Sequence, residues 1–389
     1  MEKGNSIPEE FDDIRPLLDS EVEETIEALL SDNKFRRAIE PVIKPLTWEQ
    51  LSKAMRGCKT ISEFQSKIIY PTVLNLIHKT TSELIGFNWE HFTNGKSHVV
   101  ISNHRDIVLD AAFLNILFFE KNLGTTEIAI GDNLLIYPWI TRLVRLNKSF
   151  IVKRGVSIRQ MLETSKHLSD YIHFTVCQRQ QSIWIAQREG RAKDSNDRTQ
   201  TGLLKMMTLH DSAHPLDMLQ ELNIVPLSIS YEFDPCDYLK AKEFQLKRDN
   251  ARYKKMPADD LENMITGITG WKGRVHFRFG KEINEKTTLL KEINEKGVLL
   301  DEVAKIIDEE IYRNYSFFPF NYVAYDLLTE TSTFADKYTS DDVEKFENYL
   351  NNQIRKIDIP NKDIEFLRSK IIEMYGNTLK NFLTISASS

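Results

Sequence analysis

Short β-rich runs alternate with helical segments in the middle of this chain, and this alternation constrains its fold more than any other feature. The six runs are His98–Ile101, Ile128–Ile130, Phe150–Val152, Ile183–Ala186, Ile224–Tyr231 and Val275–Phe279. Helical patterns separate several of them, for example over Ile158–Ile172. Strands that alternate with helices are typical of a layered α/β protein. The central part of the sequence therefore predicts an α/β domain.

Both ends of the chain show helical patterns instead. A helix is expected after Pro71, with Leu84 facing inward and Gly86 at its C-terminal end. Beyond about residue 283 the pattern is helical again, over Leu290–Tyr312 and Asp341–Phe382. The predicted division is a helical N-terminal region at 1–90, an α/β domain at 91–330 and a helical C-terminal region at 331–389.

Composition narrows the class of protein. The 389 residues are 41% hydrophobic and 28% charged, as in a globular protein with a sizeable core. The sequence holds no run of about 18 uncharged apolar residues and no signal-peptide pattern, so we expect neither a spanning helix nor secretion. A net charge of -6 argues against a general nucleic-acid binder. Three widely spaced cysteines indicate a reducing, cytoplasmic compartment and offer no metal-finger spacing.

The stretch SNHRDIVLD, residues 102–110, places His104 near Asp106 and Asp110. It contains the His-Arg-Asp of protein kinases, but the position that must hold a metal-binding Asn is Ala111, and no Asp-Phe-Gly follows. A metal site is disfavoured because no second His or Cys lies at ligand spacing. Two readings remain: a strand-to-helix turn in which Asp106 caps a helix over Asp106–Phe119, and a general base with an orienting carboxylate.

Three later segments accompany this stretch: SFIVKR at 149–154, QREGRAKD at 187–194 and NIVPLSISYE at 223–232. In this order, the four segments resemble the four blocks of the glycerolipid acyltransferase family, which includes glycerol-3-phosphate, dihydroxyacetone-phosphate and lysophosphatidate acyltransferases. The resemblance covers roughly residues 97–235, with weaker similarity at 273–283 and 318–328. It implies an α/β fold with a mixed sheet flanked by helices.

The resemblance also assigns roles to individual residues. His104 would be the general base that deprotonates an acceptor hydroxyl for attack on an acyl thioester, and a carboxylate would orient its ring. Arg154 would bind the phosphate of the acceptor. The remaining implied substrate-binding residues are Arg105, Phe150, Lys153, Glu189, Gly190, Arg191 and Pro226. No metal and no cofactor are implied.

The chain departs from the family pattern in two places. Five residues separate His104 from Asp110 where the family has four, so that Asp110 or Asp106 could serve the histidine. On a regular helix neither carboxylate shares a face with position 104, so His104 is expected on the preceding loop. We predict a His104–Asp110 hydrogen bond, with Asp106 accepting the amide of Val108 or Leu109. The third block is also shifted by one residue, which places Arg188 where the family has glutamate.

The predicted function is transfer of a fatty acyl chain from acyl-CoA or acyl carrier protein to glycerol 3-phosphate or a lysophospholipid. Two alternatives stay open: acylation of an aminolipid hydroxyl, and a non-catalytic relative that binds lipid or acyl carrier protein. Two basic segments, 142–154 and 240–255, and the aromatics Tyr137 and Trp139 favour peripheral docking at the cytoplasmic face of a membrane. The sequence leaves open the acceptor, the donor, the chain length and the oligomeric state.

Overall fold

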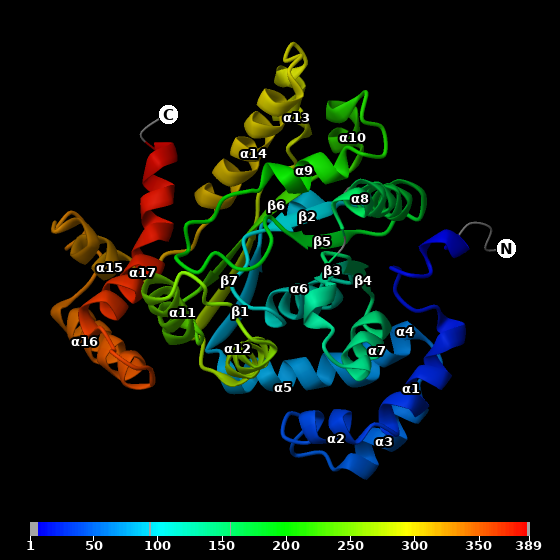
Figure 1. Ribbon diagram of the computed structural model, residues 1–389, viewed down its shortest axis with the longest axis horizontal. Helices are drawn as coiled ribbons and strands as arrows, with labels where there is room; N and C mark the ends of the chain where they lie inside the picture. Colours follow the sequence, from blue (N-terminus) through cyan, green and yellow to red (C-terminus); the bar gives the residue numbers. More distant parts are fainter. Residues whose placement is uncertain (1–6, 93–94, 156, 387–389) are drawn as a thin grey trace.

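The computed structural model describes residues 7–92, 95–155 and 157–386 (Figure 1). Its centre is a seven-stranded sheet in the order β1-β7-β6-β2-β5-β3-β4. The strands are β1 (Glu83–Phe87), β2 (Val99–Ser102), β3 (Glu127–Gly131), β4 (Ser149–Val152), β5 (Ile183–Ala186), β6 (Val225–Tyr231) and β7 (Arg274–Phe279). Neighbouring strands are parallel except β6 and β7, which pair antiparallel. The predicted mixed α/β sheet is confirmed.

Helices cover both faces of this sheet and extend beyond its ends (Figure 1). Before and within the first half of the sheet they are α1 (Val22–Leu30), α2 (Asn33–Ile39), α3 (Trp48–Arg56), α4 (Ile61–Phe64), α5 (Tyr70–Thr80), α6 (Leu109–Glu120), α7 (Pro138–Leu146) and α8 (Ile158–His173). Further along the chain they are α9 (Thr201–Met207), α10 (Pro215–Glu221), α11 (Asp237–Asp249), α12 (Pro257–Thr269), α13 (Asn284–Thr287), α14 (Lys296–Arg313), α15 (Pro319–Thr329), α16 (Ser340–Arg355) and α17 (Ile364–Ser386).

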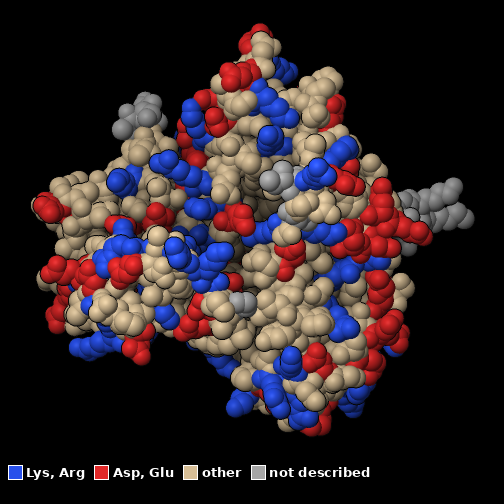
Figure 2. Space-filling model, viewed as in Figure 1, with Lys and Arg blue, Asp and Glu red and all other residues tan. Residues whose placement is uncertain are grey.

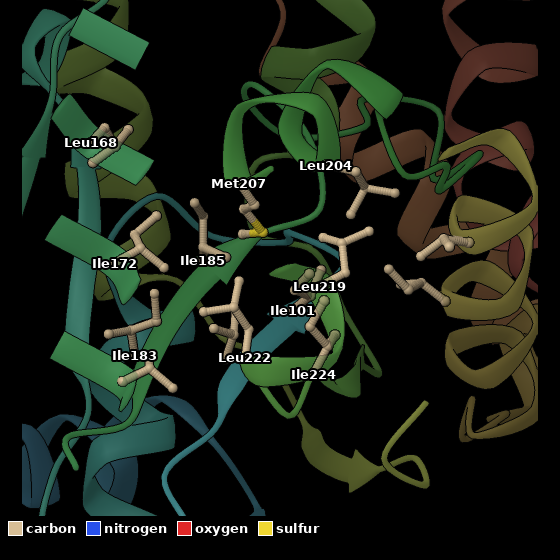
Figure 3. Close-up of a cluster of buried hydrophobic side chains, with 14 of the residues drawn as sticks. Ile101, Leu168, Ile172, Ile183, Ile185, Leu204, Met207, Leu219, Leu222 and Ile224 are labelled. Atoms are coloured by element: carbon tan, nitrogen blue, oxygen red, sulfur yellow. The ribbon is translucent and has the colours of Figure 1, made fainter. Parts of the chain in front are cut away.

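Side chains of the central strands alternate between two hydrophobic layers. In β2, Val99 and Ile101 pack into one layer with α8, α9, α10 and α14, part of which Figure 3 shows. Val100, between them, packs into the opposite layer with α5 and α6. Successive residues of a strand point to opposite faces, so a strand covered on both sides must be apolar throughout. This explains why β2 and β5 appear in the sequence as continuous apolar runs.

The helical ends of the chain form two smaller clusters on opposite flanks of the sheet (Figure 1). At the N-terminal side, apolar residues of α1 to α4 enclose Leu146 at the end of α7. At the C-terminal side, α15, α16 and α17 pack together around residues such as Phe346 and against Ala241 of α11. The proposed domain limits at residues 90 and 330 remain a prediction.

The helix expected around Leu84 and Gly86 is wrong. Helix α5 ends at Thr80, and the next residues form β1, whose Glu83 is the register partner of Arg274 in β7. Gly86 is required by packing and not by a helix end, because a Cβ atom there would lie 2.2 Å from the Trp89 ring. The helical pattern predicted over 341–382 corresponds to two helices, α16 and α17, with a break between them.

Within the described part of the chain, none of the helices combines the length and the apolar content needed to span a bilayer.

Candidate active site

The strands that precede the site residues end at one edge of the sheet. Strands β2, β5, β3 and β4 run parallel, so their carboxyl ends meet there. The loops that leave β2, β4 and β5 bring His104, Arg154 and Gly190 to the wall of one cavity. Three of the four sequence blocks therefore converge, as the resemblance implies.

The His104 ring and the Asp110 carboxylate form the centre of this site. His104 Nδ1 lies 2.8 Å from Asp110 Oδ2. The same oxygen accepts the backbone N–H of Arg105 at 2.6 Å and of Asp106 at 3.0 Å. Asp110 is fully buried, whereas the His104 side chain is 11% exposed. Because a carboxylate accepts hydrogen bonds, Nδ1 carries the proton and Nε2 keeps the lone pair that a general base needs. The predicted His104–Asp110 contact is confirmed.

Asp106 plays the capping role that the sequence predicts. Its Oδ1 accepts the backbone N–H of Val108 at 2.9 Å and of Leu109 at 2.8 Å. Helix α6 begins at Leu109 and not at 106, so the extra residue relative to the family pattern lies in the turn before the helix. Burial and the nearby Asp110 charge raise the pKa of the Asp106 carboxyl. Asp110 is therefore the partner of His104, and Asp106 holds the start of the helix.

Arg105 does not line the cavity, although the resemblance assigns it to substrate binding. Its guanidinium is buried and contacts both oxygens of Asp197, at 3.2 and 2.6 Å. Tyr315 donates its hydroxyl to the same carboxylate at 2.6 Å, and the Asn103 amide donates to it at 3.3 Å. These bonds fix the loop on either side of His104. Asp197 was not predicted as a site residue, since nothing in its local sequence marks it as the partner of a residue in another block.

A cavity of about 1600 Å³ opens beside His104. Apolar side chains of α6, α7 and α12 form much of its wall, among them Ala112, Leu143 and Leu261. Cationic side chains line it as well, among them Arg154, Arg188, Arg191 and Lys193. Figure 2 shows a hollow in the middle of this face with Lys and Arg around it. Apolar walls suit an acyl chain, and the cations suit a phosphate.

Arg154 extends across the end of β3. A Cβ atom on Gly131 would lie 2.8 Å from the Arg154 guanidinium carbon, so this approach requires glycine at position 131. One guanidinium nitrogen contacts Glu189 Oε1 at 3.2 Å. Glu189 is 68% exposed, and an ion pair so exposed to water contributes about 0–1 kcal/mol. A substrate phosphate can therefore replace Glu189 as the partner of Arg154.

Arginines from both registers of the third block reach the cavity. Arg188 and Arg191 both line it, so the one-residue shift does not remove a cation from the site. Arg191 donates to Asn263 Oδ1 at 2.8 Å, while its Nη1 and the Nε of Arg188 are buried and bond to none of the described residues. Gly190, between them, has φ of 68°, a conformation that favours glycine. Buried N–H groups that lack a protein partner are fitted to bind an anion.

The other predicted binding residues separate into two groups. Lys153 lines the cavity and forms an ion pair with Asp13. Phe150 is fully buried in the core, where its ring centroid lies 5.3 Å from that of Tyr171. Pro226 is buried near the start of β6, as its second residue. Neither Phe150 nor Pro226 is part of the described cavity lining, and both pack within the sheet, so their assignment to substrate binding stays a prediction.

Two residues of the site escape the sequence analysis. Lys193 lines the cavity and pairs with Glu243, and burial lowers the pKa of its ammonium to about 8. Trp184 packs its ring edge-on against His104, with centroids 5.7 Å apart, and donates its N–H to Ser102 Oγ at 3.0 Å. Lys193 belongs to the third block, QREGRAKD, and its place in that block could have identified it as a site residue. Trp184 lies in an apolar run, which indicates only a buried strand.

Cations of the two basic segments form hydrogen bonds and ion pairs within the chain, which their composition alone does not predict. In the first, Arg145 donates to the backbone oxygens of Arg15 and Asp12, both at 2.9 Å. In the second, Lys240 is buried and paired with Asp234. Several of these cations therefore stabilise the fold, and charge alone does not define a docking surface here.

One family model matches the part of the chain that contains the site. Residues 87–230 match the family model described as Acyltransferase. Among solved structures, the 1-acyl-sn-glycerophosphate (LPA) acyltransferase PlsC from Thermotoga maritima is similar at 13% sequence identity and a TM-score of 0.34, over 76% of this chain and 98% of that one. No curated protein matches the sequence.

The segment matched by the family model includes His104 with Asp110, and the cavity cations Arg154, Arg188 and Arg191. Residues 87–230 are therefore similar to an acyltransferase domain, and this segment holds the His104–Asp110 pair.

Proposed function

We propose that this protein transfers a fatty acyl chain from an acyl thioester, acyl-CoA or acyl carrier protein, to the hydroxyl of glycerol 3-phosphate or a lysophospholipid. The observation that carries the proposal is the His104–Asp110 pair at the wall of a cavity that is partly apolar and partly cationic. The close His104–Asp110 contact, despite the extra residue between them, favours an active enzyme over a silent relative.

The reaction follows from the tautomer of His104. Its Nε2 takes the proton of the acceptor hydroxyl as the oxygen attacks the thioester carbonyl carbon. The tetrahedral intermediate collapses, the C–S bond breaks, and the leaving thiolate receives the proton from the imidazolium. Asp110, 2.8 Å from Nδ1, stabilises the imidazolium while it carries that proton. The products are an ester and a free thiol.

An acceptor panel tests the proposal. The purified full chain is incubated with isotope-labelled acyl-CoA or acyl carrier protein and, separately, with glycerol 3-phosphate, dihydroxyacetone phosphate, lysophosphatidate and an aminolipid that bears a hydroxyl. Mass spectrometry identifies the ester, and thiol release is measured in parallel. A labelled ester on a phosphorylated acceptor supports the proposal. Absence of any ester, or an ester on the aminolipid alone, contradicts it.

Arg154→Ala is expected to raise the KM for a phosphorylated acceptor by about 10- to 100-fold, because a charged hydrogen bond contributes about 1.5–3 kcal/mol. Initial-rate kinetics with varied acceptor measure the effect. Glu189→Gln is the matched control: it removes the competing carboxylate from Arg154 and should leave KM equal or lower. An unchanged KM in Arg154→Ala would remove Arg154 from phosphate binding.

We also propose peripheral docking at the cytoplasmic face of a membrane, which a water-insoluble product requires. Met161 and Leu162 on α8 are 52% and 67% exposed, and Met256 and Ile265 on or beside α12 are exposed as well. Both helices contribute to the cavity wall. Exposed apolar side chains next to an acyl-binding cavity are suited to enter a lipid layer.

The double variant Met161→Ser/Leu162→Ser is expected to weaken binding to phospholipid vesicles by about 10-fold or more, since burial of one such side chain contributes about 1.5–3 kcal/mol. Vesicle co-sedimentation measures the loss. Leu289→Ser is the control, because Leu289 is 83% exposed but lies in the short turn Thr288–Leu290, which contributes no residue to the cavity wall. Equal losses in both variants would show that α8 is not the docking surface.

A further inference from the structure

A second polar cluster lies at the end of α8, outside the lining of the acyl-transfer cavity. His173 is the last residue of α8, Cys177 lies in the π-helical turn Phe174–Gln178 that follows, and Glu221 is the last residue of α10. One ligand atom from each of the three side chains lies within 4.8 Å of the other two. The π-helical turn sets the position of Cys177 relative to His173, and such turns are frequent at functional sites.

The orientation of His173 is fixed, and one of its nitrogens lacks a partner. The ring is 3% exposed, and its Nε2 lies 3.0 Å from the Met207 carbonyl oxygen, which can only accept. Nε2 therefore carries the proton, and Nδ1 is an acceptor. Nδ1 is buried and forms no hydrogen bond with any residue that the structure describes. It faces the Glu221 carboxylate, 3.7 Å away. Two acceptors thus point at the same space.

A bound cation would satisfy both acceptors, the Nδ1 of His173 and the Glu221 carboxylate. A histidine that binds a metal ion commonly donates its other ring N–H to a backbone carbonyl, as His173 does to Met207. Zinc bonds of about 2.0–2.3 Å place ligand atoms roughly 3.5 Å apart. The observed separations, 3.7 Å between His173 and Glu221 and no more than 4.8 Å for the other pairs, need only small side-chain rotations to reach that value. Glu221 is exposed and Cys177 is partly exposed, so both can rotate without disturbing the core.

We propose that His173, Cys177 and Glu221 bind one divalent transition-metal ion of the zinc type, with solvent in the fourth position. A thiolate and an imidazole select such an ion over Mg²⁺ or Ca²⁺. As the sulfur–metal bond forms, the S–H bond breaks and its proton passes to solvent. The ion links the end of α8 to the end of α10. Since Ser165 and Leu168 of α8 line the acyl-transfer cavity, the ion would hold one wall of that cavity in place.

Metal titration of the reduced, metal-free full chain tests the proposal. Co²⁺ is the probe, because a cobalt–thiolate bond produces a charge-transfer absorption. One Co²⁺ per chain, this absorption, and its loss on addition of Zn²⁺ are expected. Absence of stoichiometric binding, or of the absorption, would overturn the proposal.

Three variants separate the cluster from adventitious binding. Cys177→Ser should abolish the charge-transfer absorption, whereas Cys58→Ser, which alters another free cysteine, should retain it. Glu221 is exposed, so Glu221→Gln should keep the fold. It should weaken the binding of Zn²⁺ by about 10-fold or more. Zn²⁺ should also raise the Tm of the parent more than that of Glu221→Gln. Retention of the absorption in Cys177→Ser, or unchanged affinity in Glu221→Gln, would assign the ion to other residues.

Discussion

Replacement of His104 by alanine lowers kcat by about 10²- to 10⁴-fold, the range that general base catalysis contributes. No other side chain is expected to take the proton, because Asp110 is buried behind the ring and its Oδ2 already accepts two backbone N–H groups. Stability should fall by about 1 kcal/mol through the lost hydrogen bond. Steady-state kinetics on the acceptor found in the panel, with thermal unfolding in parallel, measure both effects.

The chain offers a close control for this variant. His214 lies 2.8 Å from Asp211 through the same pair of atoms, Nδ1 and Oδ2, but on the exposed surface. His214→Ala removes an equivalent histidine–carboxylate contact and should leave kcat unchanged. If His104→Ala retains near-normal turnover, or if both variants lose it equally, His104 is not the general base.

Asp110→Asn lowers kcat by about 10²-fold with little change in KM, a smaller loss than removal of the histidine. Asp110 Oδ2 accepts three N–H groups, from His104, Arg105 and Asp106. The asparagine oxygen can occupy the same position, so the ring keeps its tautomer. The negative charge opposite the imidazolium is lost, and with it the stabilisation of the proton-carrying state.

Asp106→Asn is the control for loss of a buried carboxylate in the same loop. Its oxygen can still accept the two amides at the start of α6, and it does not contact the His104 ring. Its kcat should stay within a few-fold of the parent. Asp110→Ala, in contrast, leaves two backbone amides without their acceptor and should also cost about 1–3 kcal/mol of stability. A larger kcat loss in Asp106→Asn than in Asp110→Asn would reverse the two assignments.

The sequence predicts the sheet well where strands are buried on both faces. The apolar runs of β2 and β5 leave little alternative, because any residue there must pack into one of two layers. The prediction from sequence fails at β1, because Leu84 and Gly86 continue the helical spacing of the preceding segment. Only the pairing with β7, far along the chain, makes this segment a strand. The pattern of residues within one segment cannot reveal its pairing with a distant strand.

The site divides in a similar way. His104, Asp110 and Arg154 follow from the order of the blocks, because strand ends of a parallel sheet bring them together. Phe150 and Pro226 belong to the same blocks but pack inside the sheet, and a motif does not distinguish a packing residue from a binding one. The His173 cluster was invisible, since Glu221 comes 44 residues after Cys177 and only the fold joins them.

The pairing of β1 with β7 also bears on how the chain acquires its structure. In the strand order β1 is at the edge, and β7 is its neighbour. During synthesis residues 83–87 emerge long before residues 274–279, so the first strand of the sheet must wait for the last one made. Contacts this distant in sequence form slowly, and an unpaired edge strand is a template for association with other chains. A chain cut short before residue 274 would lack β7 and helices α13 to α17, leave β1 without its partner strand and be prone to aggregate.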